Sequence, residues 1–427
     1  MKNKVESVKG TRDFYPADMA FRNWLYENIK TVSELHGYSE WDGPFLEKLD
    51  LYAAKSGEEL VKEQSFVFMD RGGDQVALRP ELTPSLARMV AQRQRELIYP
   101  LRWWAFSPFW RYERPQKGRT REFFQWNIDV IGENNIETDT EIISIAIQFF
   151  KQIGLTSDQV KIFVNNRRLM DTQLEILGVA PEQKTSVFRL IDRRDKMRPD
   201  EWKKYAQDLG LSDNVFEGVK ALMDTPDLYK QSDELVQIFD LLQEMGLSDY
   251  VVYDPKVIRG LDYYTGIVFE ARKNDNSGRA ILGGGHYDNL VSDVGGDPLP
   301  GVGFAMGDIM IRVVLEELGL IPNFPASPAD VLVTVFDESF TKDSFLLAQA
   351  LRNEGVKVVR YPTAVKLQKQ IKLADRYQIP MVCIVGPDEK AAGQVVVKSM
   401  RSGNQEIVER KNVPAVVRKF LAEESGL

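Results

Sequence analysis

The chain has 427 residues and a formal net charge of -8, with 43% hydrophobic and 28% charged residues. This length exceeds the roughly 250 to 300 residues at which a single core stops growing, so we expect more than one folding unit. The composition excludes a disordered chain, and no apolar run approaches the ~18 to 20 residues that a membrane span needs.

Cysteine and histidine are too scarce for several kinds of site. Cys383 is the only cysteine, which excludes an internal disulfide and a cysteine-based metal centre, and we expect it to be a buried apolar residue. His36 and His286 are the only histidines, which excludes a multi-histidine metal site, and no set of metal ligands is identified. The N-terminus lacks the apolar segment of a secretory signal, so we expect a cytoplasmic location.

The first 325 residues have the patterns of a mainly antiparallel sheet flanked by helices. Residues 17 to 36 and 137 to 153 have helical periodicity, and a helical insertion is predicted from about residue 166 to 250. Stretches rich in β-branched and aromatic residues predict strands. They are SFVFMD, QVALRP, LRWWAFSPFWRYE, FFQWNIDVIG, IVFEAR and RAILGGGHYDNLV.

The proline-rich segment IPNFPASPA predicts a linker, with a boundary near Pro325. The domains would therefore span residues 1–325 and 326–427. In the second domain, predicted strands at ADVLVTVFD, VKVVRYP and MVCIVG alternate with predicted helices at 342–353 and 364–377. This alternation predicts a small α/β domain, and the chain as a whole is assigned to the mixed α+β class.

A cationic hairpin is predicted where RYERPQKGRTREFFQ, residues 111 to 125, joins two aromatic strands. Pro115 and Gly118 would lie in its loop, and strand alternation would place Arg111 and Glu113 on one sheet face. Guanidinium groups suit phosphate, so the hairpin could hold a polyphosphate or the end of a nucleic acid. From this stretch alone, a solvated tip with internal ion pairs is an equal alternative.

Two glycine-bounded stretches could surround a small polar ligand. RGLDYYTG, residues 259 to 266, places two tyrosines behind an arginine, and GGGHYDNL, residues 283 to 290, suits a tight turn containing His286. Tyrosine pairs are more often core residues, however, and glycine runs also form ordinary turns. Neither stretch has the spacing of a Rossmann or P-loop phosphate site.

The charge is unevenly distributed along the chain. From Pro328 onward there are 15 Lys and Arg against 12 Asp and Glu, which leaves 40 against 51 in the preceding part. Within the tail, one face of the predicted helix AVKLQKQIKLADRY would be cationic and the other apolar. The cationic face consists of Lys366, Lys369, Lys372 and Arg376. It could contact a polyanion, whereas a solvated face is the alternative for any single lysine.

Taken in order, several of these stretches resemble the landmarks of histidyl-tRNA synthetases, a family of class II aminoacyl-tRNA synthetases. The landmarks are KGTRDFYP, Pro44 in WDGPFLE, LRPELTPSLARMV, RYERPQKGRTREFFQ, RGLDYYTG and GGGHYDNL. The tail resembles the anticodon-binding domain of that family. The resemblance spans nearly the whole chain and implies a class II catalytic domain with a helical insertion, followed by a small anticodon-binding domain.

The resemblance implies ATP-dependent ligation of L-histidine to its tRNA through a histidyl adenylate, with Mg²⁺ on the polyphosphate. Arg111 and Arg259 would be catalytic, because they would neutralise charge on phosphoryl oxygens. The ATP site would consist of Arg111, Glu113, Arg119 and Phe123, with Phe123 stacked on adenine. The histidine site would consist of Glu81, Thr83 and Gln125 at the amino group, Asp129 and Tyr264 at the imidazole, and Tyr263 as a lining residue.

The same resemblance implies contacts with tRNA and with a second copy of the chain. Gln116 would meet the extra 5′ guanosine of histidine tRNA, and the cationic helix face would meet the anticodon stem. The helical insertion would clamp the acceptor arm. A homodimer would form through the catalytic domains, with Pro44 near the interface.

Three positions depart from the family pattern. Met310 stands where class II enzymes usually place the arginine that holds the ATP γ-phosphate, Asp129 where Glu is common, and His286 where Arg is usual. Arg312 lies about 200° further round a helix than Met310, so it is not a simple substitute.

These departures leave two non-enzymatic alternatives. One is a silent paralogue, such as the regulatory subunit of the phosphoribosyltransferase that begins histidine biosynthesis. The other is a tRNA-binding sensor. The basic tail and the intact RGLDYYTG favour the enzyme over the regulatory subunit.

Overall fold

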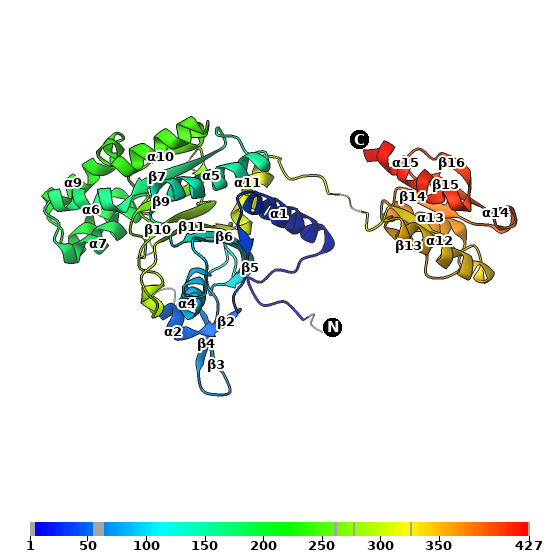
Figure 1. Cartoon of the computed structure of the whole chain (residues 1–427), viewed down its shortest axis with the longest axis horizontal. Coiled ribbons are helices and arrows are strands. Elements are labelled where there is room, and N and C mark those ends of the chain that lie inside the picture. The colour runs from blue at the N-terminus through cyan, green and yellow to red at the C-terminus, as the bar shows by residue number, and fades with distance from the viewer. Residues whose placement is uncertain (1–4, 54–63, 260–262, 276–277, 325–326, 426–427) are drawn as a thin grey trace. The chain divides into compact units, whose positions relative to one another are not determined.

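The computed structural model describes residues 5–53, 64–259, 263–275, 278–324 and 327–425. The chain divides into two units, Met1–Pro322 and Asn323–Leu427 (Figure 1). The predicted boundary residue Pro325 lies outside the described residues. In the described part of the chain, no helix is both long enough and apolar enough to cross a membrane.

An eight-stranded sheet forms the centre of the first unit. In spatial order it consists of β1 (Ser39–Glu40), β5 (Leu101–Trp110), β6 (Glu122–Ile131), β11 (Gly301–Gly307), β10 (Leu282–Tyr287), β9 (Ile267–Lys273), β7 (Val160–Asn166) and β8 (Val251–Tyr253). Only the edge pairs β1/β5 and β7/β8 are parallel. The predicted mainly antiparallel sheet is therefore confirmed.

Helices α1 (Pro16–Leu35) and α5 (Ile136–Gln152) pack on one face of this sheet, and both match their predicted ranges within one residue. The ring of Trp126 on β6 lies 5.1 Å from that of Phe149 on α5. Tyr26 of α1 lies 5.9 Å from Trp104 of β5. Since Trp126 is fully buried, its replacement by Ala would cost about 3 to 5 kcal/mol.

Between β7 and β8 the chain forms helices, which lie together at one side of the unit in Figure 1. They are α6 (Arg167–Ile176), α7 (Pro181–Asp192), η1 (Arg194–Lys196), α8 (Pro199–Asp208), α9 (Asp213–Met223), η2 (Leu228–Gln231), α10 (Asp233–Glu244) and η3 (Ser248–Tyr250). Ser212 and Ser232 cap α9 and α10 by accepting backbone N–H groups. Trp202 of α8 packs 4.7 Å from Phe216 of α9, which gives these helices a core of their own.

The first unit also contains a small sheet and further helices. A three-stranded sheet consists of β2 (Leu46–Lys48), β4 (Gln75–Leu78) and β3 (Phe66–Met69), and the helices are α2 (Leu49–Ala53), α4 (Thr83–Arg93), η4 (Ser292–Val294) and α11 (Asp308–Glu317). Arg79, directly after β4, is fully buried and joins the segment before β2 to β5. Its Nη1 lies 2.6 Å from Asp42 Oδ1, and its Nε donates to the Pro108 carbonyl at 3.0 Å.

The second unit is a five-stranded sheet with helices. The strands are β13 (Val358–Arg360), β12 (Val331–Val333), β14 (Met381–Ile384), β15 (Gln394–Ser399) and β16 (Gln405–Glu409). The helices are η5 (Glu338–Phe340), α12 (Thr341–Asn353), α13 (Leu367–Arg376), α14 (Pro387–Ala392), η6 (Arg410–Asn412) and α15 (Val413–Ser425). The three predicted strands and two predicted helices are confirmed. Cys383 is a buried core residue as predicted, and burial raises the pKa of its thiol to about 12.

Candidate active site

On the face of the main sheet opposite α1 and α5, the central strands carry mostly small residues. Cross-strand pairing places the following residues on it: Gly283, Gly285 and Tyr287 of β10; Gly301, Gly303, Ala305 and Gly307 of β11; and Gln125, Asn127 and Asp129 of β6. We call this surface the glycine face. A Cβ at Gly307 would meet nothing within 4 Å, whereas one at Gly285 would lie 2.8 Å from the Tyr264 ring. The glycines therefore make room for larger side chains above the sheet.

Gly283 to Tyr287 lie in the central strand β10, so the strand predicted at RAILGGGHYDNLV is confirmed and the turn predicted at GGGHYDNL is wrong for its first half. Strand pairing on both sides overrides the turn preference of the glycine run.

Asp129 forms the polar centre of the glycine face. Its Oδ1 accepts a hydrogen bond of 3.0 Å from the Tyr287 hydroxyl. Burial raises the pKa of Asp129 to about 7, although the Tyr287 hydrogen bond opposes the shift. Gln125 and the buried Asn127 extend the row along β6. Neither Asn127 nor Tyr287 was proposed as a site residue, although the alternating polar residues of QWNID are a signal for Asn127.

Tyr263 and Tyr264 lie beside this row, with ring centroids 4.7 Å apart. Burial raises the pKa of Tyr264, and the charges of Arg259, Asp129 and Glu81 all act on it. These residues, distant in sequence, are therefore brought together. Glu81 is buried, and Thr83 begins helix α4 two residues later. Residues 260–262 of RGLDYYTG lie outside the described residues.

Arg259 lies above Gly283, where a Cβ would collide with its guanidinium group. Its backbone is left-handed, with φ at 60°, a conformation that costs a non-glycine residue about 1 to 3 kcal/mol. Its Nη1 lies 3.3 Å from Glu270, which also pairs with Arg272. In the described part of the chain, its buried Nε has no hydrogen-bond partner. A strained arginine with a free buried donor is typical of an anion site.

The base of the hairpin differs from the predicted structure. β5 ends at Trp110, so Arg111 and Glu113 do not share a strand face. The Glu113 N–H donates to the Arg111 carbonyl at 2.8 Å, and this local bond ends the strand. Gly118, with φ at 77°, does lie in the loop as predicted, between the bridged residues Gln116 and Arg119.

The hairpin arginines divide into two groups. Arg119 pairs with Glu113 at 2.5 Å, as the alternative of internal ion pairs predicts. Arg121 Nε donates instead to the backbone carbonyl of Glu113 at 3.1 Å. Arg111 instead donates Nε to the Pro80 carbonyl and lies 5.2 Å from the ring of Phe123. Within the described residues Arg111 forms no ion pair, so its outer nitrogens are available to a ligand.

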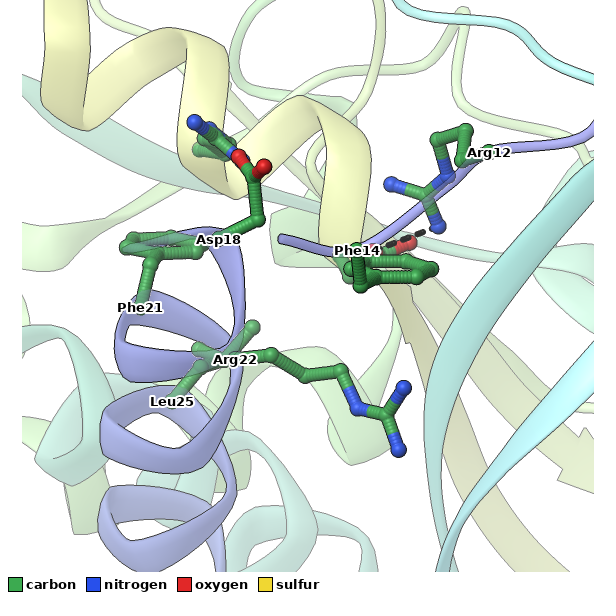
Figure 2. A pocket seen from close by; sticks show the side chains of 8 residues that line it. Arg12, Phe14, Asp18, Phe21, Arg22 and Leu25 are labelled. Carbon is green, nitrogen blue, oxygen red and sulfur yellow. Dashed lines mark hydrogen bonds and ion pairs between the residues drawn. The ribbon is translucent and has the colours of Figure 1, made fainter. Parts of the chain in front are cut away.

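Met310 and Arg312 lie on opposite sides of α11. The Met310 sulfur packs against Gly118 of the hairpin. Arg312 pairs with Asp18 of α1 at 3.2 Å and with Glu316 at 2.8 Å, in a small pocket that also contains Phe21 and Arg22 (Figure 2). Arg312 is therefore directed to α1, which supports the prediction that it does not substitute for Met310.

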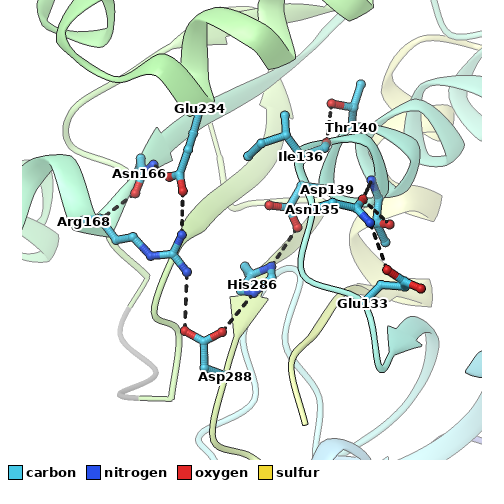
Figure 3. Close-up of polar contacts among 11 residues, drawn as sticks. Glu133, Asn135, Ile136, Asp139, Thr140, Asn166, Arg168, Glu234, His286 and Asp288 are labelled. Atoms are coloured by element: carbon cyan, nitrogen blue, oxygen red, sulfur yellow. Dashed lines mark hydrogen bonds and ion pairs between the residues drawn. The ribbon is translucent and has the colours of Figure 1, made fainter. Parts of the chain in front are cut away.

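His286 points away from the glycine face, because it alternates with Gly285 and Tyr287. Its Nδ1 lies 2.9 Å from Asp139 of α5, and its Nε2 lies 3.2 Å from Asp288 (Figure 3). Arg168 of α6 joins Asp288 to Glu234 of α10. His286 therefore links the sheet to the helices that follow β7.

In the second unit, the cationic side chains Lys366, Lys369, Lys372 and Arg376 are exposed. On the opposite side of α13, Ala374 is buried and Leu367 and Ile371 are half-buried, so the predicted amphipathic division is confirmed. Gln370 is fully buried and donates to the Val335 carbonyl at 2.7 Å, an interaction that the sequence pattern did not indicate.

Metal-ligand clusters are absent from the described part of the chain, in which no three His, Cys, Asp or Glu side chains could hold an ion together.

Models of known protein families match both units of the chain. A model of the family described as "Histidyl-tRNA synthetase" matches residues 10–309, and one described as "Anticodon binding domain" matches residues 330–420.

Curated relatives match over nearly the full length. The "Histidine--tRNA ligase, chloroplastic/mitochondrial" of Arabidopsis thaliana is 40% identical, with 95% of this chain and 85% of the relative covered. The "Histidine--tRNA ligase" of Opitutus terrae is 37% identical, with 98% and 99% covered.

Solved structures share the fold. The crystal structure of histidyl-tRNA synthetase from Nostoc sp. PCC 7120 superposes with a TM-score of 0.82 at 23% identity, over 98% of this chain and 100% of that one. The apo S. aureus histidyl-tRNA synthetase gives a TM-score of 0.71 at 22% identity, over 97% and 100%. At these identities the structural likeness establishes the fold alone.

Proposed function

The chain belongs to the histidyl-tRNA synthetase family, and on that premise we propose that it ligates L-histidine to histidine tRNA in an ATP-dependent reaction. The observation that carries this proposal is the glycine face, where a buried carboxyl, two tyrosines and a strained arginine converge. Such a surface can hold an imidazole and an anion side by side.

In the first step, a histidine carboxylate oxygen attacks the α-phosphorus of ATP, and the bond to pyrophosphate breaks. Negative charge builds on the phosphoryl oxygens, so fixed cationic donors there lower the barrier. Arg111 and Arg259 would take this role. The available nitrogens of Arg111 and the unpartnered Nε of Arg259 support the assignment.

The histidine site would be centred on Asp129, with Tyr264 beside it at the imidazole and Tyr263 as a lining residue. The carboxyl can accept from an imidazole N–H while Tyr287 holds it in place. Glu81, Thr83 and Gln125 would bind the amino group. Because an amino acid without ring nitrogens would leave these buried groups unpaired, the site can reject it by ~10⁴ to 10⁵ without editing.

ATP would bind between the hairpin and the sheet, through Arg111, Glu113, Arg119 and Phe123. Phe123 already packs 5.8 Å from Phe109 on one side, and we propose that adenine stacks on its ring. Mg²⁺ fits this site as an ion bound to ATP, because it commonly keeps its waters and takes phosphate oxygens with one or two carboxylates. Glu113 and Glu270 are the acidic candidates, and bound Mg²⁺ would neutralise the polyphosphate.

In the second step, a terminal ribose hydroxyl of the tRNA attacks the histidyl carbonyl carbon, and AMP leaves. We propose that the second unit holds the anticodon arm through Lys366, Lys369, Lys372 and Arg376. Gln116 at the hairpin tip would meet the 5′ guanosine. Phosphate contacts of this kind release counterions, so tRNA affinity should fall with added salt.

We further propose a homodimer that forms through the first unit. The small sheet β2–β4–β3 and its approach present exposed apolar side chains, namely Phe45, Leu46, Val67, Phe68 and Met69. Pro44 is exposed beside them. A dimer interface would bury such a surface. The cytoplasmic location remains a prediction.

Histidine-dependent exchange of labelled pyrophosphate into ATP, with Mg²⁺ and without tRNA, tests the proposal. The wild-type chain should support exchange, and other amino acids should not. The regulatory-subunit alternative is not favoured, since full-length relatives that include the tail are named histidine–tRNA ligases. No exchange by the folded wild-type chain would contradict the proposal and favour a silent protein.

A further inference from the structure

The hairpin loop meets α11 at a methionine rather than an arginine. Gly118 of the loop has no Cβ, and the Met310 sulfur lies where that atom would be. The contact is apolar, so α11 presents no cation to a phosphate at this point. Arg312 forms ion pairs with Asp18 and Glu316 instead.

Arg279 reaches the same point from another element. It lies on the connection between β9 and β10, and its Cδ is 3.6 Å from the position of a Cβ on Gly118. Arg279, Met310 and Gly118 therefore meet at one place. Arg279 is half-buried and, among the described residues, has no carboxylate within ion-pair distance.

The surroundings of Arg279 are strongly cationic. Burial, then the positive charge of Arg119 and also that of Arg111, lower the pKa of Arg279, while only Glu113 opposes them. Glu113 is already paired with Arg119. Arginine keeps its proton in proteins, so Glu113 balances only one of these three positive charges, and an anionic ligand would relieve the remaining repulsion.

The position of this cluster is fixed by a carboxylate on α11. Glu317 pairs with Lys117 of the hairpin loop and with Lys273 at the end of β9, both at 3.0 Å. The loop, α11 and the β9–β10 connection are thus held together. A guanidinium from the connection can therefore serve a ligand that also touches the hairpin.

Resting on the proposed function, we propose that Arg279 replaces the missing third-motif arginine and binds the terminal phosphate of ATP. Arg111 and Arg259 act at the α-phosphorus, and Arg119 with Arg279 would hold the other end of the polyphosphate. The planar fork of Arg279 suits a phosphate with two free oxygens. Met310 then acts as an apolar support for the loop.

The test compares ATP and AMP as ligands of Arg279→Ala. In pyrophosphate exchange, the KM for ATP and for pyrophosphate should rise about 10- to 100-fold, the range expected when a charge-assisted hydrogen bond is removed. The KM for histidine should stay within about 2-fold. By calorimetry, ATP should bind more weakly while AMP affinity is unchanged. Arg198→Ala, an exposed arginine at the start of α8, is the matched control and should behave as the wild type.

A second variant separates binding from folding. Arg279→Ala combined with Met310→Arg should recover most of the ATP affinity, because a guanidinium returns to the same place from α11. Recovery would exclude misfolding as the cause of the single-variant defect. Failure to recover, in a variant with wild-type circular dichroism, would contradict the proposed position.

Three other results would overturn the inference. An unchanged KM for ATP in Arg279→Ala would do so while leaving the proposed function intact. An equal weakening of ATP and AMP binding would place Arg279 elsewhere than the terminal phosphate. Normal exchange with impaired tRNA charging would assign it to a tRNA phosphate. Absence of exchange in the wild type would instead contradict the proposed function, and this inference with it.

Discussion

The Tyr287 hydroxyl donates a 3.0 Å hydrogen bond to Asp129 across the glycine residues of β11. The pair joins two strands that are not neighbours, and both side chains are buried. Because burial outweighs this bond, the pKa of Asp129 rises to about 7, close to the pH at which the protein would work.

Asp129→Asn should therefore change stability in a pH-dependent way. The folded pKa is raised above the unfolded value of 3.8, so the carboxyl destabilises the fold increasingly as pH rises from about 4 to 7. Relative to the wild type, the free energy of unfolding of the variant should be on the order of 4 kcal/mol more favourable to the fold at pH 8 than at pH 4. Urea unfolding at the two pH values measures this, with exposed Asp208→Asn as control. Equal effects at both values would contradict the burial argument.

Arg259→Ala should lower kcat for pyrophosphate exchange by roughly 10² to 10³-fold, as expected when a donor to a developing oxyanion is removed. The KM for histidine should change little, since the amino and imidazole groups are bound by other residues. Arg259→Lys should recover only part of the rate, because an ammonium cannot reproduce the planar fork. A parallel rise in both KM values with unchanged kcat would indicate a binding role instead.

His286→Gln tests the cluster behind the sheet. Burial alone lowers the pKa of His286, but Asp139 and Asp288 raise it by more, and Arg168 opposes them. Because the folded pKa is raised, the stability from this histidine is complete below about pH 6.5 and is lost as pH rises through the folded value. The substitution should therefore reduce the Tm more at pH 6 than at pH 9. His36→Gln is the control, and a difference that does not depend on pH would contradict the ion-pair account.

Neutralising the cationic face of α13 should impair aminoacylation of the tRNA and leave formation of the histidyl adenylate unchanged. With Lys366, Lys369, Lys372 and Arg376 changed to Gln, the KM for tRNA should rise while pyrophosphate exchange stays the same. The slope of log affinity against log salt should fall by roughly 0.7 to 0.9 for each phosphate that the variant no longer binds. As control, four other cations of the unit, Lys342, Lys357, Lys411 and Arg418, are changed together. Equal effects of both sets would point to net charge rather than to this face.

The long N-terminal helices and nine of the strands in the described part of the chain followed from local sequence, but seven strands did not, namely β1, β2, β7, β8, β11, β15 and β16. The strong alternation of FFQWNIDVI predicted β6, and the helical periodicity of residues 17 to 36 and 137 to 153 predicted α1 and α5. β11 was missed because GVGFAMG is rich in glycine, which normally weakens a strand. Its conformation is fixed by β6 and β10 on either side, and this depends on tertiary structure. β7 was also missed, next to the predicted helical insertion.

Site residues that lie in sequence motifs could be predicted, whereas residues that only the tertiary structure brings to the site could not. Asp129, Tyr264 and Arg259 stand in recognisable stretches, and the structure brings them together. Arg279 has no local signal, because its relation to the hairpin depends on how the β9–β10 connection folds back over residues far away in sequence. His286 looked like a turn residue but lies on the other face of a central strand, since one step along a strand reverses the direction of the side chain.

The most direct test of the account is the charging of histidine tRNA by the full chain with ATP and each standard amino acid in turn. We predict that histidine alone is attached and that the reaction requires ATP. Attachment of a different amino acid, or tRNA binding without any charging by a folded chain that contains Arg259, would contradict it.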